Sequence, residues 1–167
     1  MTKIAVLKEG AAGETRVAAS PETVKKFIAL GASVAVEKGA GLSASIADVD
    51  YEAAGATIGT MAATLKDAEI VLGVQGPDPK VLKGLKDGAW IVAGLDPFGQ
   101  RKRVDEYAKT GVEALAMEFM PRITRAQSMD ILSSQSNLSG YKAVIDAAGI
   151  YGRAFPMMMT AAGTVSA

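Results

Sequence analysis

The sequence predicts an α/β fold with a doubly wound, mostly parallel sheet, and three observations indicate it. First, short apolar segments alternate with helical patterns along most of the 167 residues, which is typical of βαβ units. Second, these segments are apolar throughout, as expected for parallel strands that are covered on both faces of a sheet. Third, several expected strands follow a glycine, a residue that commonly ends a helix: Gly31, Gly55, Gly88 and Gly111.

The first half of the chain supplies the expected elements in order. Ile4–Leu7 is a first strand. Ser20 is a good N-cap residue and Pro21 suits the first position of a helix, so we expect a helix that begins here and ends at Gly31. The pattern then predicts a strand at 33–36, a short helix at 48–54, a strand at 56–58, a helix at 61–68 and a strand at 69–74.

The second half continues the alternation. After Pro77-Asp-Pro79 the pattern predicts a helix to Leu85. Trp90 falls within the next expected strand, so we expect its ring in the core. A long helix is predicted from about Ser133 to about Tyr151, because apolar residues recur there at helical spacing. Between these segments the pattern predicts a strand at 89–93, a helix at 101–109 and a strand at 112–117.

Composition excludes several classes of function. Lys and Arg together number 18, as do Asp and Glu, so neither a nucleic-acid surface nor a polybasic membrane anchor is expected. The chain has no cysteine and no histidine, which excludes thiolate chemistry and removes the commonest zinc ligand and general base. We therefore expect no bound metal. No export signal is recognisable and no apolar run approaches the roughly 20 residues that span a bilayer, so we expect a cytoplasmic chain without direct membrane insertion.

The polar segment 121–133 is the strongest candidate site. It follows the expected strand 112–117, and open α/β sheets place ligand-contacting groups at the carboxyl ends of strands. Arg122 supplies a planar fork of donors, while Gln127 and Asp130 can recognise a carboxamide. The alternative is a solvated connection with ordinary capping residues, and the residues alone support both interpretations equally.

Three segments carry a resemblance to a known family. Lys8–Pro21 is similar to the opening motif of the alanine dehydrogenase and transhydrogenase superfamily, and Val34–Gly41 is similar to its second strand and turn. Pro121–Asp130 closely resembles a loop of the transhydrogenases specifically. The whole chain resembles the N-terminal part of the soluble NAD(H)-binding component (domain I) of the proton-translocating transhydrogenase, at the start of its alpha subunit.

The resemblance implies a fold, a reaction and a set of contacts. It implies a flavodoxin- or Rossmann-like domain, the first of two in an NAD(H)-binding component, in an enzyme that passes hydride between NAD(H) and NADP(H). The loop 121–133 would cover the nicotinamide of NADH. The cofactors carry the chemistry, so the protein positions them and supplies no acid or base. By position, the implied contacts are Arg122, Gln127, Asp130 and Ser133, with Tyr141 on the following helix.

The resemblance also implies a domain organisation and partners. Residues 1–151 would form the first α/β domain, and 152–167 would begin a crossover to an NAD-binding Rossmann domain that the chain does not contain. Alone, the chain is therefore expected to be inactive. The implied partners are an NADP(H)-binding component, a membrane component that conducts protons and a second copy of the chain. The complex would hold the chain at the cytoplasmic side of the bacterial inner membrane.

Two alternatives to this function remain. An alanine dehydrogenase in this family uses an arginine, a lysine and a histidine. Arg16 matches the arginine, but Gln75 occupies the lysine position and Leu95-Asp-Pro97 carries no histidine. We therefore expect Arg16 to be structural, bonding loop carbonyls or a nearby acid. The other alternative is a non-catalytic assembly module, because such folds host many functions.

Overall fold

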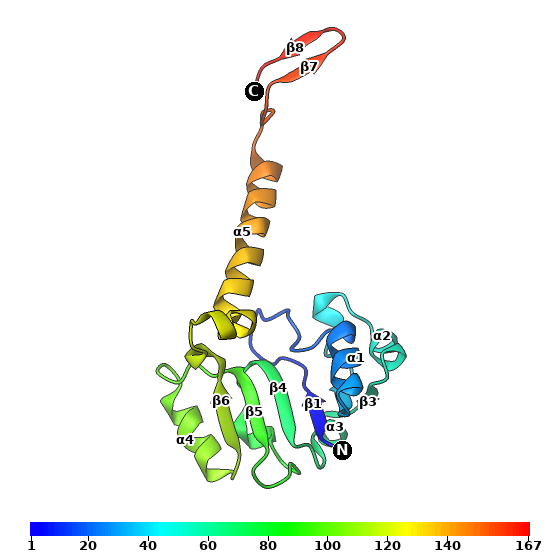
Figure 1. Cartoon of the computed structure of the whole chain (residues 1–167), viewed down its shortest axis with the longest axis vertical. Coiled ribbons are helices and arrows are strands. Elements are labelled where there is room, and N and C mark those ends of the chain that lie inside the picture. The colour runs from blue at the N-terminus through cyan, green and yellow to red at the C-terminus, as the bar shows by residue number, and fades with distance from the viewer. The chain divides into compact units, whose positions relative to one another are not determined.

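A computed structural model describes all residues from 1 to 167 (Figure 1). Contacts within the chain divide it into two units, Met1–Phe119 (unit 1) and Met120–Ala167 (unit 2). Unit 1 contains the sheet, and unit 2 contains the polar segment 121–133. The predicted division at residue 151 concerns a crossover to a further domain and stays a prediction.

Unit 1 is built on a six-stranded sheet in the order β3-β2-β1-β4-β5-β6, in which every neighbouring pair is parallel. The order reverses between β1 and β4, as in Rossmann dinucleotide-binding folds, whose ligands lie beyond the carboxyl ends of the strands at this switch point. The predicted doubly wound α/β fold is confirmed. The strands are β1 Lys3–Val6, β2 Ser33–Glu37, β3 Thr57–Gly59, β4 Ile70–Gln75, β5 Trp90–Gly94 and β6 Glu113–Ala116.

The connecting helices form mostly where the sequence predicts them. The Ser20 hydroxyl accepts a hydrogen bond from the Thr23 N–H at 3.3 Å, and Pro21 is the first helical residue, as expected. The four α-helices of unit 1 are α1 Pro21–Ala29, α2 Asp48–Ala53, α3 Met61–Leu65 and α4 Arg101–Lys109. Short 3₁₀ turns lie at Leu42–Ala44, Pro79–Val81 and Met117–Phe119.

The two faces of the sheet bury separate cores, because successive side chains of a strand point to opposite faces. In β1, Ile4 and Val6 pack in one cluster with Val24 of α1 and Tyr51 of α2. The alternate residues of the first strand region belong to the other cluster, which also contains Leu65 of α3 and Tyr107 of α4. Helices α1 and α2 therefore cover one face, and α3 and α4 cover the opposite one.

One half of the sheet keeps an exposed apolar row. Leu72, Val92 and Leu115 are register partners on β4, β5 and β6, so they share a face. Leu72 packs against the cluster under α1 and α2, but Leu115 is 41% exposed. Trp90, on the same face of β5, is 46% exposed. The prediction that Trp90 is a core residue is wrong, because no helix of unit 1 covers this end of the strand.

The segment after Pro77 also differs from the prediction. The helix expected up to Leu85 is a single 3₁₀ turn, Pro79–Val81. Gly84 has φ +84°, a left-handed conformation that a continuing helix cannot adopt. Its carbonyl accepts a hydrogen bond from the Asp67 N–H at 2.8 Å instead.

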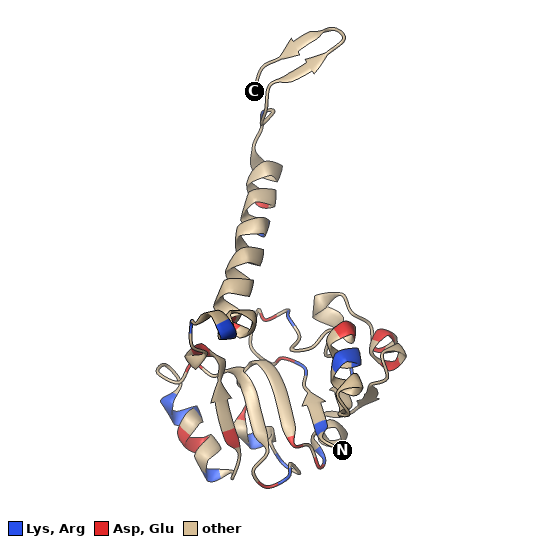
Figure 2. Ribbon diagram, in the orientation of Figure 1, with Lys and Arg blue, Asp and Glu red and all other residues tan.

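Unit 2 contains a 3₁₀ helix (η4, Thr124–Met129), the helix α5 (Ile131–Ile150) and an antiparallel hairpin of β7 (Met158–Thr160) and β8 (Gly163–Val165). The sequence predicts the long helix within two residues at each end, but it does not predict the hairpin. Figure 2 shows both signs of charge scattered over unit 1 and few charges on α5 and the hairpin. None of the helices is both long enough and apolar enough to span a lipid bilayer.

Candidate functional site

Four of the five predicted contact residues lie together in unit 2. Arg122, Gln127, Asp130 and Ser133 line one cavity of about 550 Å³. The 3₁₀ helix η4 brings Gln127 near Asp130, and the first turn of α5 adds Ser133. The spacing of these residues in the sequence thus becomes a single polar surface.

Asp130 organises this cavity. Its Oδ1 accepts from the Leu132 N–H at 2.9 Å, which makes Asp130 the N-cap of α5. Its Oδ2 accepts from the Ser133 hydroxyl at 2.6 Å and lies 3.8 Å from Arg122 Nε. The Ser133 hydroxyl, the backbone N–H groups of α5 and the Arg122 guanidinium together lower the pKa of Asp130 below its ordinary value. Asp130 is therefore a carboxylate that accepts hydrogen bonds at neutral pH.

The cavity presents both donors and acceptors to a ligand. The Arg122 side chain is 72% exposed, so most of its fork of donors faces solvent, while the Asp130 side chain is only 9% exposed. Gln127 adds an amide with two donors and an acceptor. This set suits a neutral carboxamide, which has an acceptor oxygen and a donor nitrogen. It contains no group that titrates near neutral pH, so it is suited to positioning a ligand.

Tyr141 is the predicted contact that the structure does not bring to this cavity. It lies on α5 with 69% of its surface exposed, and it is not among the lining residues. Eight residues of helix separate it from Ser133, or about 12 Å along the axis. Its assignment to the site stays a prediction.

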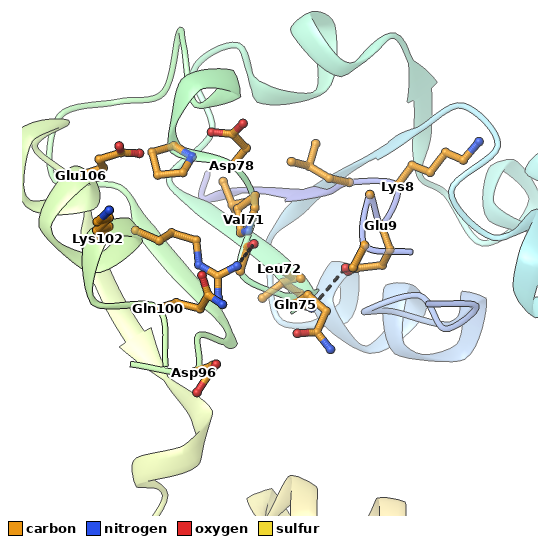
Figure 3. Close-up of a pocket in the computed structure, with 18 residues that line it drawn as sticks. Lys8, Glu9, Val71, Leu72, Gln75, Asp78, Asp96, Gln100, Lys102 and Glu106 are labelled. Carbon is orange, nitrogen blue, oxygen red and sulfur yellow. Dashed lines mark hydrogen bonds between the residues drawn. The ribbon is translucent and has the colours of Figure 1, made fainter. Parts of the chain in front are cut away.

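A second cavity, of about 650 Å³, lies in unit 1 at the switch point of the sheet (Figure 3). We call it the switch-point crevice. It is lined by the segments that follow β1, β4 and β5 and by the start of α4. In Figure 3, Lys8 and Glu9 lie on one side, and Gln100, Lys102 and Glu106 on the other. The sequence did not predict this crevice, although the carboxyl ends of β1 and β4 are the signal that could have located it.

Arginine and tyrosine side chains hold the α4 side of the switch-point crevice. Arg103 donates to the Gly76 carbonyl at 3.1 Å and to the Leu95 carbonyl at 2.6 Å, so it joins the loops after β4 and β5. The Tyr107 hydroxyl donates to the Pro77 carbonyl. Burial raises the pKa of Tyr107 to about 12. These groups are engaged with the backbone and leave the loops in a fixed arrangement.

Two glutamates extend the strand pairing at the same edge of the sheet. Glu9 accepts from the Val74 and Gln75 N–H groups at 2.6 and 3.1 Å, beyond the point where β1 stops pairing with β4. Glu118 accepts from the N–H groups of Leu95 and Asp96 in the same way, at 3.2 and 2.7 Å. Burial raises the pKa of Glu9 above its ordinary value, although the two N–H bonds act in the opposite direction.

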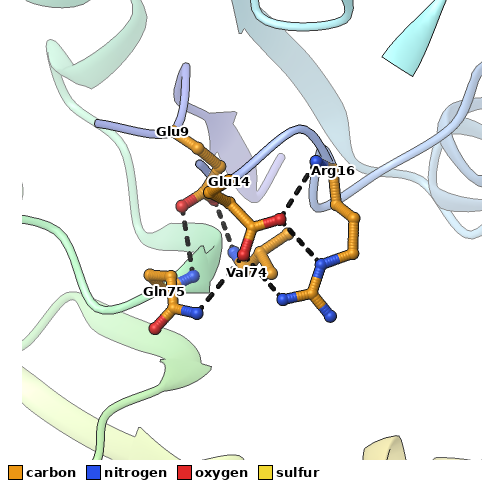
Figure 4. Close-up of polar contacts among 5 residues, drawn as sticks. All are labelled: Glu9, Glu14, Arg16, Val74 and Gln75. Atoms are coloured by element: carbon orange, nitrogen blue, oxygen red, sulfur yellow. Dashed lines mark hydrogen bonds and ion pairs between the residues drawn. The ribbon is translucent and has the colours of Figure 1, made fainter. Parts of the chain in front are cut away.

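Glu14, Arg16 and Gln75 form a polar cluster beside the switch-point crevice (Figure 4). The two Glu14 oxygens accept from Arg16 Nε and Nη2 at 2.7 and 2.6 Å, and Oε2 also accepts from Gln75 Nε2 at 3.3 Å. The hydrogen bonds from Arg16 lower the pKa of Glu14 to about 2. Arg16 therefore pairs with a nearby acid, as the sequence predicts for a structural arginine.

This cluster does not assemble a site for a 2-oxo acid. The Arg16 fork is paired with Glu14, and an uncharged Gln75 stands where the resemblance places a lysine. Asp96, at the third position, turns its carboxylate to the Gly99 N–H at 3.2 Å. No free cation of this cluster is aimed at a substrate carboxylate.

The comparisons with known proteins agree on one group of relatives. Residues 5–139 match the protein family described as "Alanine dehydrogenase/PNT, N-terminal domain". The chain is 54% identical to the first of the separate polypeptides of the NAD(P) transhydrogenase alpha subunit of Rhodospirillum rubrum, over 98% of this chain and 44% of that protein. It is 40% identical to the "NAD(P) transhydrogenase subunit alpha" of Haemophilus influenzae, over 97% of this chain and 31% of that protein. The chain thus spans less than half the length of these curated relatives.

Solved structures give the same result. The crystal structure of transhydrogenase from Sinorhizobium meliloti superimposes with a TM-score of 0.87 and 52% identity, over 98% of this chain and 49% of that one. An L-alanine dehydrogenase superimposes with a TM-score of 0.67 and 26% identity, over 75% of this chain and 35% of that one. The similarity to the transhydrogenase is therefore greater in both sequence and structure.

Proposed function

The chain belongs to the family of alanine dehydrogenase and PNT N-terminal domains, and on this premise we propose that it forms the NAD(H)-side part of a transhydrogenase. Its segment 121–133 contacts the nicotinamide of NADH. The observation that carries this proposal is the single cavity lined by Arg122, Gln127, Asp130 and Ser133. The similarity to transhydrogenase alpha subunits over 98% of the chain supports it.

The residues of the cavity fit the carboxamide of a nicotinamide. Asp130, kept ionised by Ser133 and Arg122, accepts from the amide nitrogen. Arg122 donates to the amide oxygen or to the pyrophosphate, and Gln127 orients the ring. In the reaction, the hydride leaves C4 of the NADH ring and bonds to C4 of the NADP⁺ ring, so that no proton is taken up or released by the protein at this step. The contribution of this chain is the distance and angle of one ring.

Other components complete the enzyme in this proposal. The relatives are more than twice as long as this chain, and an NAD-binding Rossmann domain, in the same polypeptide or a separate one, supplies the main dinucleotide pocket. A partner binds NADP(H), and a membrane component couples hydride transfer to proton movement. The chain acts as a dimer at the cytoplasmic face of the bacterial inner membrane. Residues 152–167 lead toward the Rossmann domain, and Tyr141 lies near the nicotinamide in the complete site.

Two other functions are less well supported. The Glu14–Arg16 pair and Gln75 disfavour an alanine dehydrogenase, because no free cation is left for a substrate carboxylate. A non-catalytic assembly module would not need four converging polar side chains in one cavity. The similarity to enzymes over nearly the whole chain also favours the catalytic role.

The test is the rate of hydride transfer in the assembled transhydrogenase that contains this chain. We expect Arg122→Ala to slow the transfer from NADPH to an NAD⁺ analogue by about 10- to 100-fold, with an unchanged circular dichroism spectrum. Arg101→Ala is the matched control, because Arg101 is also an exposed arginine paired with an aspartate, on α4. Equal rates for the two variants would overturn the proposal.

The isolated chain provides a second test. Because it supplies the nicotinamide contacts without the Rossmann domain, we expect NADH to bind it weakly or not at all, as followed by the fluorescence of the reduced nicotinamide. Tight and saturable binding would show that these 167 residues build a dinucleotide pocket of their own.

A further inference from the structure

One amide at the switch-point crevice has a fixed orientation. Gln75 ends β4 and lines the crevice, and its Nε2 donates to Glu14 Oε2 at 3.3 Å. Arg16 keeps the pKa of Glu14 at about 2, so the carboxylate has no proton at neutral pH and can only accept. The amide nitrogen must therefore face Glu14. The amide oxygen then faces the other way, as Figure 4 shows.

The remainder of Gln75 is held as well. Its backbone N–H donates to Glu9 at 3.1 Å, so Glu9 fixes the main chain while Glu14 fixes the side chain. No donor of the chain is hydrogen-bonded to the amide oxygen of Gln75. A half-buried acceptor in a fixed position, without a partner, is the arrangement expected of a group that binds a ligand donor.

The charges at the crevice decide which donors are favoured. The nearest fork of donors, Arg16, is paired with Glu14, so it is not available to a carboxylate or phosphate. Acids outnumber bases among the lining residues, which favours uncharged donors over anions. The acids are Glu9, Asp78, Asp96 and Glu106, and the bases are Lys8, Lys102 and Arg103.

From this arrangement we infer that Gln75 is a binding residue that accepts a hydrogen bond from an uncharged N–H or O–H group of the nicotinamide dinucleotide. Glu14 is the positioning residue that turns the amide oxygen of Gln75 to the ligand. The inference rests on the proposed function, which supplies the dinucleotide as the ligand. Two parts of NADH have the required chemistry, namely the carboxamide nitrogen and the ribose hydroxyls.

The experiment measures the Kd of NADH for the complete NAD(H)-binding component that contains this chain. We expect Gln75→Ala to raise the Kd about fivefold to tenfold, the effect of one lost hydrogen bond. Glu14→Gln allows the amide of Gln75 to turn, so we expect a smaller increase. Gln100→Ala, which removes another glutamine of the same crevice, is the matched control and leaves the Kd unchanged.

A second ligand distinguishes the two donors. In 3-acetylpyridine adenine dinucleotide a methyl group replaces the amide nitrogen, so the carboxamide donor is absent. If Gln75→Ala weakens NADH but not the reduced analogue, the donor is the carboxamide; equal weakening of both assigns a ribose hydroxyl. An unchanged Kd for both ligands overturns the inference and leaves the proposed function intact. Failure of the wild-type component to bind NADH would overturn both.

Discussion

Replacing Glu14 by glutamine tests the polar cluster that orients Gln75. The substitution keeps the size of the side chain but removes the negative charge that pairs with Arg16 through contacts of 2.6 and 2.7 Å. It leaves the Arg16 guanidinium without its partner carboxylate and the amide of Gln75 free to turn. We therefore expect a loss of stability in unit 1 that depends on pH.

The magnitude follows from the pKa of Glu14. A value lowered to about 2 in the folded state would correspond to about 3.4 kcal/mol. Because the Arg16 side chain is 45% exposed, solvent screening reduces this to about 1–2 kcal/mol. The folded-state pKa is below the unfolded one, so this stabilisation is complete above about pH 4.5 and is lost as the pH falls toward 2.

The assay is urea unfolding followed by the fluorescence of Trp90, the one tryptophan of the chain and a residue of unit 1. At pH 7 we expect Glu14→Gln to be less stable than the wild type by about 1–2 kcal/mol. At pH 2.5 the difference between the two proteins is expected to fall to about half or less. Glu113→Gln is the control, since Glu113 is exposed on β6. A difference that is the same at both pH values would refute the reasoning, because it would then arise from packing and not from charge.

Two further predictions concern the packing that supports the site. Gly41→Ala would place a Cβ 2.8 Å from the Ile46 carbonyl oxygen and from the ring of Tyr51, so thermal unfolding should show a loss of about 1–3 kcal/mol; Gly10→Ala, with open space around it, should change stability by less than about 0.5 kcal/mol. Tyr51→Phe removes a buried hydrogen bond of 2.8 Å to the Ala19 carbonyl and should cost about 1–3 kcal/mol in urea unfolding, whereas an unchanged midpoint would show that water replaces the hydroxyl.

Much of the fold could be predicted from local signals in the sequence. The Ser20-Pro21 pair marks the start of α1, and the glycines mark the turns before the strands. The failures occur where tertiary context decides. Trp90 is apolar and lies in a strand, but the absence of a helix over its end of β5 cannot be read from local pattern. The segment after Pro79 has helical composition, but the left-handed Gly84 ends the first turn.

The two cavities differ in how far the sequence predicts them. The cavity of unit 2 is formed by residues within one stretch of the chain, from Arg122 to Ser133, so a local motif was sufficient to identify its members. The cluster beside the switch-point crevice joins Glu14 to Gln75, which are 61 positions apart. Only the parallel pairing of β1 with β4 brings these segments together, and a single sequence contains no direct signal of that contact.

The most direct test of the proposed function is single-turnover hydride transfer by an assembled transhydrogenase that carries Asp130→Asn. Asparagine caps helices as well as aspartate does, so the start of α5 is retained while the charge facing Arg122 and Ser133 is removed. The account predicts that the rate of transfer falls about 10-fold or more, with the circular dichroism spectrum unchanged. A rate equal to that of the wild type would contradict it and would leave segment 121–133 as a structural connection.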